Sequence, residues 1–147
     1  MGGWPTLNFP RPELTFRRKG TTIEVLDRVR KRWLVLTPEE WVRRHVIDWL
    51  IKEGVAPESL IQEYPVELNG QPQRADIVWV GSDTKPRLVV ECKSTDVELS
   101  PSVLDQVVRY NYILKARYVM LTNGLKTLLY EFDGERYTPT KDLDIHP

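Results

Sequence analysis

Two acidic side chains are spaced in this sequence so that a pair of strands would bring them together. Residues 74–80 and 87–93 are rich in Val, Ile and Trp, and the segment between them contains Gly, Ser, Asp and Pro. This pattern predicts a β-hairpin. If the hairpin folds symmetrically about its turn, Asp76 lies directly across from Glu91, at about one cross-strand spacing.

Lys93 and Cys92 complete this end of the predicted hairpin. Because side chains alternate between the faces of a strand, Asp76, Glu91 and Lys93 share one face and the Cys92 side chain points to the other. Burying two unpaired carboxylates side by side costs several kcal/mol. A hard divalent cation, Mg²⁺ or Mn²⁺, relieves the repulsion because it accepts carboxylate and carbonyl oxygens and keeps several waters.

The expected metal ligands are therefore the carboxylates of Asp76 and Glu91 and the backbone carbonyl of Cys92. The Lys93 ammonium can then hold or deprotonate an attacking water, or neutralise charge on a phosphate. The alternative is a surface hairpin in which Asp76, Glu91 and Lys93 form an ordinary salt bridge.

Five short motifs follow one another along the chain. They are LTPEEWVR at residues 36–43, RADI at 74–77, VECK at 90–93, Gln106 with Tyr110, and LTNG at 121–124. Asp76 followed by Glu91-Cys92-Lys93 is similar to the signature of the PD-(D/E)XK nuclease superfamily. Together the motifs resemble the N-terminal nuclease domain of type I restriction enzyme R subunits, over roughly residues 14–132. Ala75 stands where the superfamily name has Pro, at a position that does not touch the metal.

The resemblance implies an α/β fold with a restriction-endonuclease-like core. This core is a central mixed β-sheet flanked by helices, here with an N-terminal β-hairpin extension. It also implies a Mg²⁺-dependent endonuclease that hydrolyses DNA phosphodiester bonds, with Lys93 orienting the attacking water. The competing hypothesis is a catalytically silent nucleic-acid-binding or protein-interaction module with the same fold.

A helix expected from Pro38 to about Lys52 would carry a further acid. Thr37 is its N-cap, and Glu40 completes a capping box. Glu39 lies in the middle of the apolar face on a helical wheel. The superfamily often places one more acid on this helix, so Glu39 is the candidate to tune the metal or bind a second ion. Alternatively, both acids complement the helix dipole. His45 is expected on the polar side.

A second helix is expected from residue 101 to about residue 114, after Ser100 as its N-cap. Gln106 and Tyr110 lie one turn apart on it. They resemble a Gln-x-x-x-Tyr element that several such nucleases carry after the Glu-x-Lys strand. The resemblance implies that Gln106 supports the metal site and that Tyr110 contacts DNA. The alternative for Tyr110 is a half-buried core aromatic.

The other apolar or alternating stretches of the sequence predict strands. In the stretch at residues 59–68, Pro65 indicates that the strand lies at a sheet edge or is bulged. The predicted elements are a hairpin at residues 13–27, an apolar run at 33–36 leading into the first helix, and strands at 59–68, 117–122 and 127–132.

The charge balance divides the chain into a basic and an acidic part. The net charge is zero, but residues 1–52 carry 11 Lys and Arg against 6 Asp and Glu, whereas residues 53–147 carry 10 against 15. Lys and Arg contact DNA phosphates and release counterions. Arg30, Lys31 and Arg43 are therefore candidate DNA contacts, and the alternative is a solvated charged face.

Length and composition indicate one domain, residues 1–147, with a loose arm at 1–12 and an unpatterned tail at 138–147. No apolar run approaches the roughly 20 residues of a membrane span. A single cysteine fits a reducing compartment, so the cytoplasm is expected. The expected partners are DNA and either a second copy of the chain or a restriction-type motor.

Overall fold

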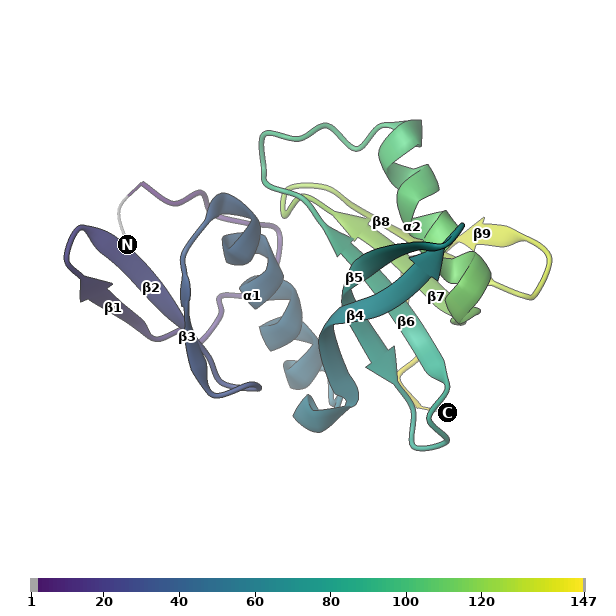
Figure 1. The fold of residues 1–147 in the computed structure, drawn as a ribbon, viewed down its shortest axis with the longest axis horizontal. Coiled ribbons are helices and arrows are strands. Elements are labelled where there is room, and N and C mark those ends of the chain that lie inside the picture. The colour runs from purple at the N-terminus through teal and green to yellow at the C-terminus, as the bar shows by residue number, and fades with distance from the viewer. Residues whose placement is uncertain (1–2, 147) are drawn as a thin grey trace.

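A computed structural model describes residues 3–146 of the chain (Figure 1). Within these residues the chain forms two sheets and two α-helices. In order, the elements are β1 (Phe16–Lys19), β2 (Thr22–Asp27), β3 (Arg32–Val35), α1 (Pro38–Lys52), a 3-10 turn (Pro57–Ser59), β4 (Leu60–Leu68), β5 (Gln71–Val80), β6 (Pro86–Cys92), α2 (Pro101–Leu114), β7 (Tyr118–Thr122), β8 (Thr127–Phe132) and β9 (Tyr137–Pro139). Neither described α-helix is long and apolar enough to cross a membrane.

The larger sheet has six strands in the order β4-β5-β6-β7-β8-β9. Only β6 and β7 pair in parallel, joined by a crossover through α2, and the other neighbours are antiparallel. Figure 1 shows α1 against one face of this sheet and α2 against the other. The prediction of an α/β fold with a mixed sheet flanked by helices is therefore confirmed.

The two sheet faces carry separate apolar clusters. Val42, Val46 and Leu50 of α1 are fully buried against one face, and Val107 and Tyr110 of α2 pack against the other. The alternating apolar residues of β5, β6 and β7 supply both clusters, as the two-residue period of a strand requires. The sheet is thus buried on both sides, and its strand ends are where polar groups can gather.

The predicted N-terminal hairpin is part of a three-stranded sheet, because residues 32–35 form β3 and pair with β2. These residues were expected only to lead into the first helix. The turn before β3 contains Lys31 in the left-handed region, at a φ of 57°. That conformation is usually marked by Gly or Asn, so the turn carries no recognisable signal.

The first helix begins as predicted. The Thr37 side chain accepts a hydrogen bond of 3.1 Å from the backbone N–H of Glu40, and Gly54 follows the end of the helix at a φ of 112°. The prediction that His45 lies on a polar side is wrong, because its ring is buried and packs edge-on against Trp41 at 4.6 Å. This side of α1 is covered by the N-terminal part of the chain, where Phe16 of β1 also packs near Trp41.

The arm, which was expected to be loose, and the tail both have side chains packed against the core. Leu7 is buried in the α1 cluster and contacts Gly124, where an added Cβ would lie 2.8 Å from its side chain. The backbone N–H of Asn8 donates to the Gly124 carbonyl at 2.8 Å. At the other end, Leu143 and Ile145 pack on the same cluster. The parts of the arm and tail predicted at residues 1, 2 and 147 lie outside the described residues.

Candidate active site

The hairpin of β5 and β6 has the predicted register. Ile77 pairs with Val90, and the symmetric pairing continues to the β-bulge near the turn. One residue beyond that pair, Asp76 meets Glu91. The Asp76 Oδ2 atom also accepts a hydrogen bond of 2.7 Å from the backbone N–H of Cys92. Cys92 itself packs in the α1 cluster, on the face opposite to the acids.

The neighbouring strand bends at the same level. The β4–β5 pairing includes Gln62 with Ile77 and Tyr64 with Ala75, and Glu63 between them adopts a φ of 55°. A left-handed conformation costs a residue other than Gly roughly 1–2 kcal/mol. Local strain of this kind is often found at functional sites, and here it lies across from the expected metal ligand on β5.

Glu91 is the most perturbed carboxylate of this site. Its side chain is buried, and its Oε2 atom has no hydrogen-bond partner among residues 3–146. Burial raises the pKa of Glu91 well above its ordinary value. Hydrogen bonding to Asp76 and the charge of that carboxylate raise the pKa further, while Lys93 opposes the shift. Without an added cation, Glu91 is therefore protonated at neutral pH.

Lys93 is held from the second helix. Its Nζ atom donates to Oε1 of Gln106 at 3.3 Å, and Nε2 of Gln106 donates to the Tyr110 hydroxyl at 3.1 Å. The structure thus connects Lys93 to the Gln106–Tyr110 pair, which the sequence analysis placed on the second helix. The Tyr110 side chain is otherwise packed in the core beneath α2, as expected of a core aromatic.

Glu39 lies on the first turn of α1, beside the acidic pair. Its Oε1 atom is 3.3 Å from Nη2 of Arg43, and the same nitrogen donates to Oδ1 of Asp76 at 3.1 Å. Partial burial and then the Asp76 charge raise the pKa of Glu39. Glu40 instead pairs with the guanidinium groups of Arg43 and Arg44. Of the two acids, Glu39 is the one that shares a guanidinium nitrogen with Asp76.

Arg43 occupies a position that the sequence analysis did not foresee. Its side chain is buried and turned into the acidic cluster, where Glu40, Glu39 and Asp76 all accept from its guanidinium. Arg43 was expected to contact a DNA phosphate, but in this structure its guanidinium binds carboxylates. A contact between Arg43 and DNA stays a prediction. The spacing from Glu39 and Glu40 by four and three residues was the available signal, because such pairs meet on a helix.

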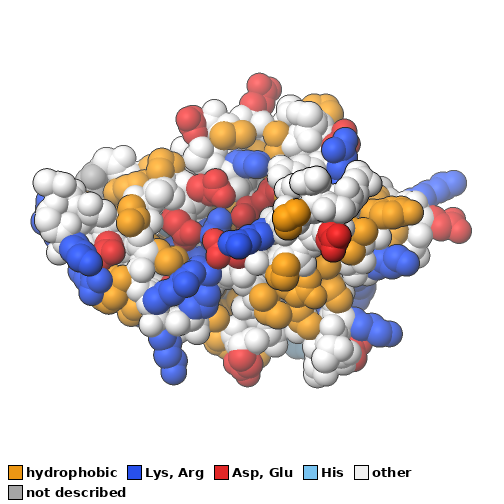
Figure 2. All heavy atoms as spheres, in the orientation of Figure 1, with side chains coloured by type: hydrophobic (Ala, Val, Ile, Leu, Met, Phe, Trp, Pro, Cys, Tyr) orange, Lys and Arg blue, Asp and Glu red, His pale blue; other side chains and the backbone are white. Residues whose placement is uncertain are grey.

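The other two basic candidates lie near the N-terminal sheet. The Nε atom of Arg30 contacts Asp27 at 2.5 Å, and Nη1 of Arg30 donates to Glu63 at 3.3 Å. Lys31 is exposed in its turn. Figure 2 shows acidic and basic side chains gathered in the middle of one face, between α1 and the β4–β5 hairpin. Acidic and basic side chains are therefore interspersed on this face.

The family comparison bears directly on this arrangement. The family described as the type I restriction enzyme R protein N terminus matches residues 38–143. The chain belongs to this family. The match confirms the resemblance seen in the five motifs, and it includes α1, the six-stranded sheet and α2. No curated protein and no solved structure matches the chain at a significant level.

The metal implied by this family can be tested against the side chains. No group of three or more His, Cys, Asp or Glu residues in the described part of the chain has the arrangement of a metal site. Mg²⁺, however, is usually held by only one or two carboxylates and retains several waters. Asp76, Glu91 and the Cys92 carbonyl match that donor set, and the free Oε2 atom of Glu91 is a buried oxygen in need of a cation.

Proposed function

We propose that the chain is a Mg²⁺- or Mn²⁺-dependent endonuclease that hydrolyses DNA phosphodiester bonds. The observation that carries the proposal is the half-buried Asp76 beside the buried Glu91, which has one carboxyl oxygen without a described hydrogen-bond partner and lies close to Lys93. A purely structural cluster gains nothing from a buried carboxyl group that has to take up a proton on folding. Family membership supports a nuclease-like role in restriction.

Each polar residue of the site has a separate task in this proposal. Asp76, Glu91 and the Cys92 carbonyl hold the metal, which when bound lowers the pKa of a water and offsets charge on the phosphate. The Lys93 ammonium orients the attacking water and counters the charge that develops on the phosphate oxygens. Glu39, on the adjoining helix turn, tunes the metal or binds a second ion.

The second helix keeps the ammonium in place. Gln106 accepts a hydrogen bond from Lys93 and donates one to Tyr110, so the orientation of its amide is fixed from both ends. We assign Gln106 a positioning role and Tyr110 a contact with DNA. The basic residues near the N-terminal sheet, Arg30 and Lys31, would contact phosphates further along the DNA.

A plasmid-nicking assay in Mg²⁺ or Mn²⁺ tests the proposal. Lys93→Ala should lower the nicking rate by about 10²–10³-fold, the effect of losing one group that stabilises developing charge. The matched control is Lys85→Ala, because Lys85 is exposed in the β5–β6 turn at the other end of the hairpin. Wild-type nicking by the Lys93 variant would refute the role of this ammonium.

Metal binding is measured separately by titration calorimetry. The wild type should bind Mg²⁺ or Mn²⁺, and Asp76→Ala should not. Binding without nicking would keep the metal site and indicate a missing partner. We propose that this partner is a second copy of the chain or a restriction-type motor, and that the protein works in the cytoplasm, where its single cysteine stays reduced.

A second candidate function is a catalytically silent nucleic-acid-binding or protein-interaction module. The observation that favours it is Arg43, which neutralises Asp76 and Glu39 as a structural counter-ion would. In that case the wild type binds no metal at millimolar concentration, and Asp76, Glu91 and Lys93 are reduced to an ion-pair cluster.

A further inference from the structure

A polar groove of about 700 Å³ lies beside the Lys93 site, between the β4–β5 turn and α2. Gln106 and Tyr110, which connect to Lys93, form part of its lining. The groove therefore reaches the residue that holds the proposed catalytic ammonium, Gln106, and runs along α2 to Tyr112.

The lining is rich in side-chain amides. Asn69, Gln71 and Gln73 come from the hairpin, facing Gln106 on the helix. An amide donates and accepts hydrogen bonds side by side, and this combination matches the edge of a nucleic-acid base. The Gln106 amide is occupied by Lys93 and Tyr110, so the three hairpin amides are the ones suited to bases rather than to an apolar ligand.

Two further residues of the groove have no role in the fold. Tyr112 is 80% exposed, the most exposed of the large apolar residues described. Arg109 is exposed and has no ion-pair partner within residues 3–146. An exposed aromatic ring next to a free guanidinium is the combination that binds a base by stacking and its phosphate by charge.

The net charge of the groove points to an unpaired strand. Arg109 is balanced by Asp105, the acid in the lining, so the groove has little field with which to attract a duplex through its phosphates. In a duplex the ring faces of the bases are stacked inside and cannot reach Tyr112. Amides and an aromatic ring become effective only when the bases are splayed out.

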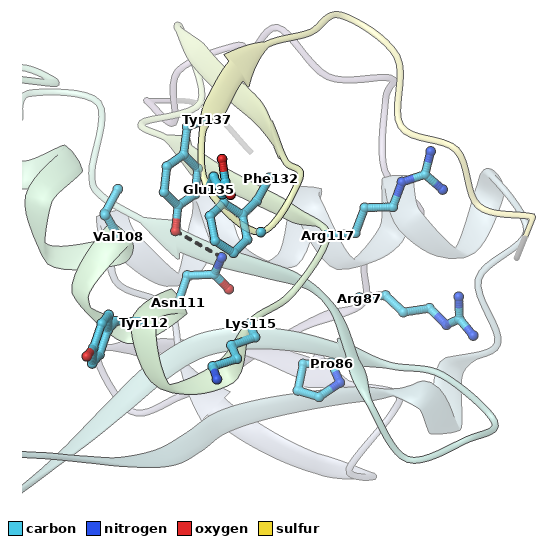
Figure 3. Close-up of a pocket in the computed structure, with 11 residues that line it drawn as sticks. Pro86, Arg87, Val108, Asn111, Tyr112, Lys115, Arg117, Phe132, Glu135 and Tyr137 are labelled. Atoms are coloured by element: carbon cyan, nitrogen blue, oxygen red, sulfur yellow. Dashed lines mark hydrogen bonds between the residues drawn. The ribbon is translucent and has the colours of Figure 1, made fainter.

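Tyr112 also borders a second hollow, of about 800 Å³, at the end of α2. Figure 3 shows Tyr112 on the last turn of this helix and Lys115 directly after its end, with Phe132 and Tyr137 on the neighbouring strands. From Gln106 to Tyr112 the helix rises about 9 Å, or about three nucleotide steps at the duplex rise. A strand that passes Tyr112 therefore continues towards another cation.

We propose that this groove binds an unpaired strand of nucleic acid and presents it to the Lys93 site. Tyr112 stacks on a base, Arg109 contacts a phosphate, and the hairpin amides contact base edges. The inference rests on the proposed function, because it names the form of substrate that the same site receives.

Binding is measured without metal, by fluorescence anisotropy in EDTA, so that no cleavage occurs. The probes are a labelled single strand of about 15 nucleotides, near the upper site size of single-strand binders, and a duplex of the same sequence. We expect the single strand to bind at least about tenfold more tightly. Tyr112→Ala should weaken its binding by about 5- to 100-fold, the range for loss of one stacked base, and Tyr112→Phe should retain it.

Two matched variants serve as controls. Ile113→Ala changes the next residue on the helix, which is also exposed but does not line the groove, and should bind as the wild type does. Arg109→Gln should reduce the slope of log K against log salt by about 0.7, the value for one phosphate contact on a single strand. Arg136→Gln, on the distant β8–β9 turn, should leave the slope unchanged.

Equal affinity for single strand and duplex, or wild-type binding by Tyr112→Ala, would overturn the groove assignment. The two proposals fail in different ways. A wild type that binds the single strand but never nicks DNA keeps the groove and refutes the nuclease. A wild type that nicks plasmid, together with a Tyr112→Ala variant that binds the single strand as tightly as the wild type does, keeps the nuclease and refutes the groove.

Discussion

Two clusters of buried carboxylates lie near α1, and they differ in how well their charges are matched. In the first, Asp27 is fully buried at the end of β2. It accepts hydrogen bonds from the backbone N–H groups of Val29 and Arg30, from the Arg30 side chain and from Gln62, and it forms an ion pair of 3.2 Å with Arg44. Both of its oxygens are therefore fully satisfied.

In the second cluster, Glu91 is almost as deeply buried but lacks such partners. One oxygen is without a hydrogen bond from any described residue, and the nearest carboxylate belongs to Asp76. Burial alone would raise the pKa of either acid. At Asp27 the Arg30 hydrogen bond and the Arg44 charge outweigh burial and lower the pKa, whereas at Glu91 burial and Asp76 act together to raise it.

The comparison shows that burial by itself does not identify a functional acid. Asp27 and Glu91 differ in the supply of positive charge and donors around them. A complete set of partners indicates a structural role, and a deficit indicates a place where a cation or a proton is needed. The following experiments change one side of this comparison at a time.

The largest change in the free energy of unfolding is expected from removing the charge of Asp27, which is fully paired. Asp27→Asn should lower the free energy of unfolding by about 3–5 kcal/mol, because Arg44 and Arg30 are left without their buried partner. Urea denaturation measures the change. The control Glu131→Gln breaks an exposed pair with Arg117, 2.8 Å apart, and should cost less than about 1 kcal/mol. Similar losses for both variants would contradict the distinction.

Replacing Glu91, the acid without matching partners, should raise the free energy of unfolding instead of lowering it. Glu91→Gln replaces a carboxyl group that must take up a proton on folding with a neutral group of the same shape. Without metal at pH 7, we expect this variant to be about 1–3 kcal/mol more stable than the wild type. Thermal unfolding in EDTA measures it, and a destabilised variant would show that Glu91 already has adequate partners.

The two acids should also give opposite pH dependences. The folded-state pKa of Glu91 is raised, so its contribution is present below its unfolded value of 4.5 and is lost as the pH rises through neutrality. The slope approaches about 1.4 kcal/mol per pH unit for one proton. The folded-state pKa of Asp27 is lowered, so its contribution is present above 3.8 and is lost on acidification. Unfolding measured from pH 3 to pH 9 should show the alkaline decline in the wild type but not in Glu91→Gln.

The smallest change in stability is expected from adding Mg²⁺, which would supply positive charge to Asp76 and Glu91. Mg²⁺ at about three times its dissociation constant should stabilise the wild type by about 0.8 kcal/mol. The same addition should leave Asp76→Ala unchanged, because the variant lacks a ligand. Thermal shifts in matched ionic strength distinguish specific binding from general screening. Equal shifts in both proteins would place the cation elsewhere.

The register of the central hairpin was predictable because each of its faces is buried. A slip of one residue would turn Val78 and Val89 to the wrong side of the sheet, so the apolar pattern fixes which residue meets Asp76. The first helix was predictable from its cap, since Thr37 satisfies a backbone group locally. Both depend on residues close in sequence.

The rest of the site depends on packing between distant segments. From the sequence, Arg43 is expected to be a surface cation. In the structure, α1 packs so that the guanidinium of Arg43 contacts Asp76 on β5. His45 reads as exposed until the N-terminal arm covers that side of α1. The left-handed backbone conformation at Glu63 could not be predicted, because the residue is neither Gly nor Asn. Local periodicity contains no information on such contacts.

The reactivity of the Cys92 thiol can report local opening of the structure around the site. Cys92 is the single cysteine of the chain and is completely buried in the α1 cluster, one residue from both Glu91 and Lys93. Burial raises the pKa of its thiol, and only the thiolate reacts with disulfide reagents. Modification must therefore wait until this end of the sheet opens. The rate at which a thiol reagent modifies Cys92 then reports how often β6 separates from α1, without any added label.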